Sequence, residues 1–355
     1  MEKIKLYYPY NHYNKEYRSH VFPLLKPFFK PKEFTDQQRI KLYGVSEQDF
    51  SFVNELEHAT AVILPMSWEY YLITKQIDKA KNLIEMSAQH NKKVILVSVG
   101  DYGSVIPKYD NVEVLRTSGD HLKLESNNHG IPVFIEDPMP RIYGKNEMSS
   151  NYAVQPIIGF CGQTNADITN AIKETVKVAL RNIAYYVGVN TNAPQKIQST
   201  TYNRSKTLTV IKKSKRLTAN IIERKQYRAG ACKETDRKKT ELEFYDNIVG
   251  SNYIICIRGA GNFSVRLYET LAMGRIPVFI NTDCLVPLPD LIDWKKHMVW
   301  VEFDQLHKLE EKIIEFHNKF TEEEFKQLQY ANRVLWKDKL TLKGFFTSYL
   351  TTRRT

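Results

Sequence analysis

The chain has 355 residues, of which 42% are hydrophobic and 26% charged, and its formal net charge is +11 at pH 7. This length predicts two domains with sizeable cores. No run of about 20 apolar residues occurs and the first ten residues lack a signal-peptide core, so we expect neither a membrane span nor secretion. The cysteines are far apart in the sequence, which favours reduced thiols in a cytoplasm over a zinc site.

The first half of the chain alternates apolar runs typical of strands with stretches typical of helices. Strands are expected at residues 3–8, 61–64, 93–99 and 131–135, and helices at 49–58 and from 67 toward 90. Such alternation predicts an α/β domain with a mostly parallel sheet, which we assign to residues 1–150.

Two carboxylates in this half follow predicted strands. Glu69 stands in the first turn of the helix that follows 61–64, and Asp101 lies in the glycine-bearing loop after 93–99. Loops at the carboxyl ends of parallel strands commonly carry function. Each residue is therefore a candidate functional carboxylate, and for each the alternative is a simple helix cap.

The second half begins another strand series, which we assign to a domain at 151–330 followed by a helical tail at 331–355. The expected elements are a strand at 156–160, a helix at 165–187, a mobile loop at 190–207, a strand at 208–211 and a helix at 240–249. Gly162 lies in a glycine-bearing turn after the first of these strands. That turn either faces a ligand cleft or is a plain capped turn.

Much of the positive charge lies between residues 196 and 239. Three interpretations compete: a nucleic-acid surface, an anionic-membrane surface or a solvated face. No nucleic-acid-binding module accompanies the charge, so we expect no nucleic-acid partner and favour the solvated face. Contact with anionic lipid or a lipid-linked acceptor is the functional alternative. Arg224, Lys225 and Arg228 precede Gly230 and are secondary candidates for phosphate binding.

Residues 253–280 carry the clearest functional pattern. An apolar run predicts a buried strand, a glycine turn follows, and an amphipathic helix then leads to a second buried strand. The turn of such a βαβ unit offers backbone N–H groups, and the helix dipole favours an anion. The candidate ligands of a sugar nucleotide are Arg258, Gly259, Gly261, Asn262, Ser264, Arg266 and Glu269. The arginines suit phosphate and the glutamate suits a ribose diol. The alternative is an ordinary βαβ unit with an Arg–Glu surface pair.

Three motifs in this region resemble those of the exostosin family, glycosyltransferase family 47. They are Arg258-Gly259, Ser264-Val265-Arg266-Leu267-Tyr268-Glu269 and Gly274-Arg275-Ile276-Pro277-Val278, and the resemblance covers roughly residues 240 to 320. It implies a GT-B fold, in which two Rossmann-like domains face a cleft and a C-terminal helix crosses back to the N-terminal domain. The C-terminal domain would then hold the donor and the N-terminal domain the acceptor.

The resemblance also implies an inverting glycosyltransferase that moves a sugar from a nucleoside-diphosphate sugar, here expected to be a UDP-sugar, to a glycan acceptor. Arg258 and Arg266 would stabilise the leaving diphosphate, and Asp101 or Glu69 would be the base. The chain contains no Asp-x-Asp motif, so neither a metal nor another cofactor is expected. The setting would be cell-surface polysaccharide or lipopolysaccharide synthesis, in the cytoplasm or at the inner membrane face. The alternatives are a fucosyltransferase-like enzyme that uses a GDP-sugar, and a non-catalytic protein that binds sugar or nucleic acid.

Overall fold

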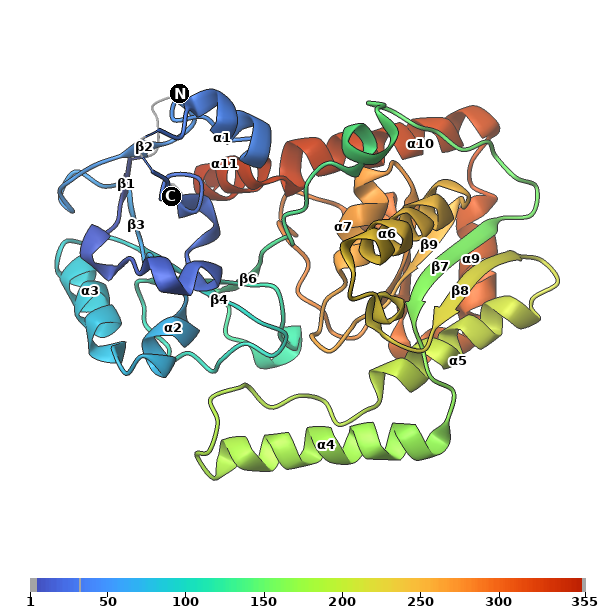
Figure 1. Cartoon of the computed structure of the whole chain (residues 1–355), viewed down its shortest axis with the longest axis horizontal. Coiled ribbons are helices and arrows are strands. Elements are labelled where there is room, and N and C mark those ends of the chain that lie inside the picture. The colour runs from blue at the N-terminus through green and yellow to red at the C-terminus, as the bar shows by residue number, and fades with distance from the viewer. Residues whose placement is uncertain (1–4, 32, 353–355) are drawn as a thin grey trace.

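The computed structural model describes residues 5–31 and 33–352, without the side chains of Tyr227 and Arg228. Figure 1 shows two α/β lobes side by side, each built on a twisted sheet. All strand pairs within both sheets are parallel. Among the described residues, no helix is both long enough and apolar enough to cross a bilayer.

The N-terminal sheet has the strand order β2-β1-β3-β4-β5-β6. Its strands are β1 (Lys5–Tyr7), β2 (Ser51–Phe52), β3 (Ala61–Ile63), β4 (Val94–Ser98), β5 (Val112–Arg116) and β6 (Asn128–Gly130). Its helices are α1 (Asp36–Tyr43), α2 (Trp68–Ile73) and α3 (Ile77–Gln89), with short helical turns at Tyr10–His12, Lys15–His20, Pro23–Leu25, His121–Lys123 and Met139–Tyr143. The central strands β3, β4 and β5 are buried along their whole length, as expected for a sheet covered on both faces.

Three sequence-based expectations for this lobe are wrong. The expected helix at 49–58 contains the edge strand β2, because Ser51 and Phe52 pair with β1. The expected strand at 131–135 is irregular, because the pairing of β5 with β6 ends at Arg116 and Gly130. Its apolar residues pack on the C-terminal helix, where the rings of Phe134 and Phe346 lie 6.0 Å apart. The helix expected from 67 toward 90 is two helices, which are separated at Lys75 by a left-handed residue (φ 56°).

The C-terminal sheet has the strand order β11-β10-β9-β7-β8. Its strands are β7 (Ile157–Gln163), β8 (Thr218–Arg224), β9 (Tyr253–Cys256), β10 (Ile276–Asn281) and β11 (Val299–Glu302). Its helices are α4 (Ile168–Tyr186), α5 (Thr200–Lys213), α6 (Glu234–Val249), α7 (Val265–Ala272), α8 (Trp294–His297), α9 (Leu309–His317) and α10 (Glu322–Leu335), with turns at Tyr227–Gly230, Phe303–Lys308 and Trp336–Leu340.

The basic segment of this lobe also differs from expectation. The predicted loop at 190–207 and strand at 208–211 overlap α5, which Ser199 caps by accepting a hydrogen bond from the Tyr202 N–H. Leu208 and Ile211 are buried on one face of that helix. Gly162 lies inside β7 and not in a turn, because β7 extends to Gln163 and pairs with β8 along its full length.

The C-terminal helix α11 (Leu342–Thr352) returns to the N-terminal lobe, as Figure 1 shows at the top of the molecule. The Phe346 ring lies 5.5 Å from the ring of Phe22, and Lys343 pairs with Asp49 at 2.7 Å. Phe346 is buried to 1% exposure, so α11 adds to the N-terminal core. Two parallel α/β domains joined by a returning C-terminal helix confirm the predicted GT-B fold.

Candidate functional site

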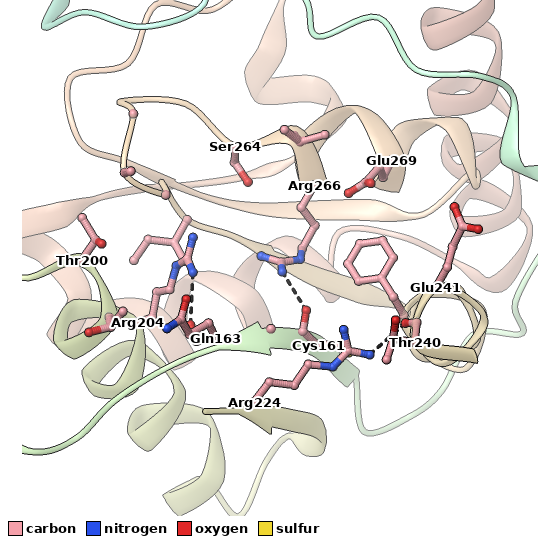
Figure 2. Close-up of a pocket in the computed structure, with 18 of the residues that line it drawn as sticks. Cys161, Gln163, Thr200, Arg204, Arg224, Thr240, Glu241, Ser264, Arg266 and Glu269 are labelled. Carbon is pink, nitrogen blue, oxygen red and sulfur yellow. Dashed lines mark hydrogen bonds between the residues drawn. The ribbon is translucent and has the colours of Figure 1, made fainter. Parts of the chain in front are cut away.

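A pocket of about 760 Å³ opens at the carboxyl ends of β7 and β9 in the C-terminal lobe, and Asp101 of the N-terminal lobe lines its edge. The first turns of α5 and α7 and one face of α6 form its walls. Figure 2 shows the side chains of Arg204, Arg224 and Arg266 gathered around the end of β7. Two helix N-termini and three guanidinium groups therefore face one cavity, a combination that favours an anion.

The glycine turn after β9 forms one rim of the pocket through Gly259 and Gly261. A Cβ atom at Gly261 would lie 2.6 Å from the Asp101 carbonyl oxygen and 2.4 Å from the Phe263 ring, so only glycine fits there. The turn therefore meets the loop after β4 from the opposite lobe. Ser264 occupies the N-cap of α7 without a side-chain capping bond, and it lines the pocket with Arg266 and Glu269.

Contacts with β7 fix the position of the Arg266 side chain. Its Nη2 donates to the Cys161 carbonyl oxygen at 2.8 Å, and its guanidinium stacks over the Phe160 ring at 4.4 Å. A Cβ atom at Gly162 would lie only 2.7 Å from Arg266 Nη2, so the strand glycine leaves room for this side chain. Burial lowers the pKa of Arg266, and the charge of Glu269 opposes that shift.

Arg204, which the sequence analysis missed, belongs to the same group. It donates from Nε to the Arg258 carbonyl oxygen and from Nη1 to the Gln163 carbonyl oxygen, both at 3.1 Å. Burial, and next the charge of Arg266, lower the pKa of Arg204 to about 10, so it stays protonated at neutral pH. The signal that could have found it is Ser199, a helix cap placed before the Leu208–Ile211 apolar spacing.

The α6 side of the pocket carries mixed charge. Arg224 lines the pocket while donating to the Thr240 carbonyl oxygen at 2.9 Å and pairing with Glu243. Arg237 and Lys238 also line this wall. Burial raises the pKa of Tyr245, and the negative charge of Glu269 raises it further. The charge of Glu269 therefore acts on the α6 side of the pocket.

Four predicted ligands are not brought to the pocket surface or are not described. Arg258 is buried beneath the turn, where its Nη2 donates to the Ala260 carbonyl oxygen at 3.1 Å. Asn262 is fully buried and joins the lobes, because its amide donates to the carbonyl oxygens of Gly119 and Asp283, both at 3.0 Å. Lys225 is exposed outside the pocket, and the Arg228 side chain lies outside the described part of the chain.

The two candidate bases have different surroundings. Asp101 is exposed and lines the pocket from the N-terminal lobe. Glu69 accepts hydrogen bonds from the Ser98 hydroxyl at 2.6 Å and the Val99 N–H at 2.9 Å, so it caps the end of β4. A second cavity of about 920 Å³ is lined by Gly100, the residue before Asp101, and by the C-terminal Trp336. Gly100 and Asp101 are adjacent in the chain, so the loop after β4 contributes one residue to each cavity.

Metal-binding groups do not gather here. Within the described ranges, no cluster of three or more His, Cys, Asp or Glu side chains could hold a metal ion. The positive charge in the pocket comes instead from arginine and lysine, together with the helix N-termini.

The fold and site define a GT-B protein with a cationic pocket in its C-terminal domain. Residues 150–315 match the model of the Exostosin GT47 domain, which confirms the resemblance to exostosin-like glycosyltransferases of family 47 in that part of the chain. Two probable glucuronosyltransferases of Oryza sativa subsp. japonica are 34% and 33% identical over 67 residues, 19% of this chain and 16% of each rice protein. The chain therefore matches only a small part of these relatives.

Among solved structures, the crystal structure of TarM has a TM-score of 0.35 and 12% sequence identity, covering 74% of this chain and 50% of that chain. A mutant of S. aureus TarM, in complex with Fondaparinux, alpha-GlcNAc-glycerol and UDP, has the same TM-score and coverage at 13% identity.

Proposed function

We propose that the chain is an inverting, metal-independent glycosyltransferase that uses a nucleoside-diphosphate sugar, with a UDP-sugar as the first choice. The observation that carries this proposal is the meeting of Arg204 and Arg266 with two helix N-termini in one pocket, with Glu269 beside them. Each arginine uses only some of its N–H groups on backbone carbonyls, so others remain for phosphate oxygens. The exostosin match over this domain supports the same donor class.

In the proposed reaction the acceptor hydroxyl oxygen attacks the anomeric carbon of the donor. A bond forms between that oxygen and the anomeric carbon while the bond from this carbon to the diphosphate oxygen breaks. The bonding pair leaves with the diphosphate, which Arg204, Arg266 and the N–H groups of α7 stabilise. Asp101 takes the acceptor proton, and the configuration at the anomeric carbon inverts. No protein-bound intermediate is required.

The acceptor is assigned to the second cavity, which adjoins Asp101 through Gly100. We propose a growing glycan of a cell-surface polysaccharide or lipopolysaccharide as the acceptor, and the cytoplasm or its membrane face as the location. The rice relatives are named glucuronosyltransferases, so UDP-glucuronate heads the list of donors to be tested.

The experiment is a donor screen that measures nucleotide release from a panel of UDP-sugars and GDP-sugars, with and without excess EDTA. Release from a UDP-sugar that persists in EDTA and is lost in Arg266→Ala is the expected result. Lys225→Ala is the matched control, because Lys225 is an exposed cation outside the pocket. Release only from GDP-sugars would favour the fucosyltransferase-like alternative. Loss in EDTA with recovery in manganese would overturn the metal-free mechanism, and no release from any donor would favour a binding protein.

A further inference from the structure

The helix α4 presents its apolar side chains to solvent. Ile168, Ile172, Val176, Leu180 and Ile183 are spaced by three or four residues, so they form one stripe along the helix. Their exposed fractions lie between 50% and 62%, and no residue of α4 is buried. Figure 1 shows α4 along the lower edge of the molecule, apart from both sheets. A surface helix normally turns such a stripe toward the core, whereas α4 turns its stripe toward solvent.

Polar contacts on the inner face of α4 fix this orientation. Glu174 accepts hydrogen bonds from the hydroxyls of Ser199 at 2.6 Å and Thr201 at 2.8 Å. The Asn182 amide donates to the Gln195 carbonyl oxygen at 2.7 Å. The Arg181 guanidinium lies 3.6 Å from the centre of the Tyr102 ring in the opposite lobe. The polar face is therefore used for packing, and the apolar stripe is held outward.

The exposed apolar surface continues past the end of the helix. Tyr186 is 76% exposed, Val187 67% and Val189 77%. Contiguous apolar surface of this kind marks an interaction site on a soluble domain. A tyrosine at one end of the stripe also suits the boundary between a lipid headgroup layer and water.

The charges around the stripe indicate the partner. Lys173 and Lys177 are exposed along one edge of α4, and Lys196 is exposed on the segment that follows. Glu174 is the sole carboxylate between residues 168 and 197, and it faces inward. An apolar face with a lysine edge is the pattern of helices that lie on anionic membranes. The net charge of +11 attracts such a surface and opposes pairing with a second copy of this chain.

We propose that α4 docks the protein on an anionic lipid bilayer, lying parallel to the surface with its apolar stripe between the headgroups. Its 19 residues give a contact line of about 28 Å. The inference rests on α4 itself and does not depend on the proposed enzymatic function. Because Glu174 binds Thr201 in the first turn of α5, the bilayer would lie beside one wall of the donor pocket.

Flotation of the full chain with lipid vesicles tests this proposal. We expect strong binding to vesicles of phosphatidylglycerol and phosphatidylcholine, and weak binding to phosphatidylcholine alone. The triple variant Ile172→Gln, Val176→Gln, Leu180→Gln should bind anionic vesicles at least about a hundred-fold more weakly. Its melting temperature should stay near that of the parent, since the substituted side chains are exposed.

A matched triple variant places the same substitution at exposed apolar residues outside α4, namely Ile73→Gln, Val154→Gln and Tyr330→Gln. It should bind vesicles as the parent does. The pair Lys173→Gln, Lys177→Gln should lose about thirty-fold on anionic vesicles and little on neutral ones.

Three results would overturn the proposal. The first is failure of the parent chain to float with anionic vesicles, and the second is unchanged flotation of the α4 triple variant. The third is a parent chain that forms a dimer without lipid, together with an α4 triple variant that is monomeric but still binds vesicles. The last outcome would assign the stripe to a second copy of the chain.

Discussion

Arg204 and Arg266 come from different helices but donate to carbonyl oxygens only two residues apart on β7, those of Gln163 and Cys161. The pairing of β7 with β9 covers Ile158 and Gly159 and does not extend to these positions. The arginines thus donate hydrogen bonds to β7 carbonyl oxygens that β9 does not pair with. The same contacts orient their remaining N–H groups toward the pocket. The end of β7 and the cationic pocket are therefore built from the same arginine contacts.

This relationship predicts that the two arginines act together. Arg204→Ala and Arg266→Ala should each lower kcat/KM by about 10²–10³, close to the loss of one donor from an oxyanion site. The double variant should lose less transition-state stabilisation than the two single variants lose together, because in the proposed reaction both groups bind the same diphosphate. Steady-state kinetics of the two single variants and the double variant decides this. Parental kinetics in Arg204→Ala would remove that residue from the site.

The two candidate bases should separate in their effects. Asp101→Asn should lower turnover by about 10²–10⁴ while nucleotide affinity stays unchanged, since the carboxylate is assigned to the acceptor proton. Glu69→Gln should instead lower the free energy of unfolding by about 1–2 kcal/mol, because one of the two oxygens that accept from the Ser98 hydroxyl and the Val99 N–H becomes a donor. Full turnover in Asp101→Asn, with severe loss in a well-folded Glu69→Gln, would reverse the assignment.

The returning helix α11 should be part of the N-terminal core. Phe346→Ala should destabilise the protein by about 3–5 kcal/mol, since this buried ring packs on Phe22 and Phe134. Hydrogen exchange should show the lost protection in β1 and β4, far from residue 346 in sequence. The exposed neighbour gives the control, Thr347→Ala, which should change little. Unchanged protection in those strands would show that α11 does not support the N-terminal lobe.

His12 should make the fold sensitive to acid. It is buried with its Nδ1 2.9 Å from the Tyr71 hydroxyl, and burial lowers its pKa to about 4 from 6.5. Between these values the unfolded chain binds a proton that the folded chain does not, so stability falls as the pH falls from 6.5 toward 4.

The size of this effect should be roughly 2 kcal/mol, and His12→Gln should remove it. Urea unfolding at about pH 7.5 and about pH 5 measures the difference. Equal acid sensitivity in parent and variant would show that another group carries it.

The sequence predicted the βαβ unit at residues 253–280 well, because its signals are local: a continuous apolar run, a glycine turn and Pro277 after the helix. It did not predict α5, whose start is polar and whose position depends on the hydrogen bonds from Ser199 and Thr201 to Glu174. Arg204 was missed for that reason.

Only the tertiary contacts show which residues of the glycine turn face the pocket and which have a structural role. Arg258 and Asn262 share the turn with Gly259 and Gly261, yet their side chains point into the protein. The amide of Asn262 meets residues more than 140 positions upstream in the sequence, at Gly119 and Asp120. Such a contact between lobes leaves no periodic pattern in the sequence.

The most direct test of the donor site is a calorimetric comparison of UDP and uridine binding to the parent chain and to the double variant Arg204→Ala, Arg266→Ala. The two ligands differ only in the diphosphate. We predict that the parent binds UDP at least about a hundred-fold more tightly than uridine, and that the double variant loses most of this difference. Equal affinity for the two ligands in the parent, or an unchanged difference in the double variant, would contradict the assignment of this pocket to a nucleoside diphosphate.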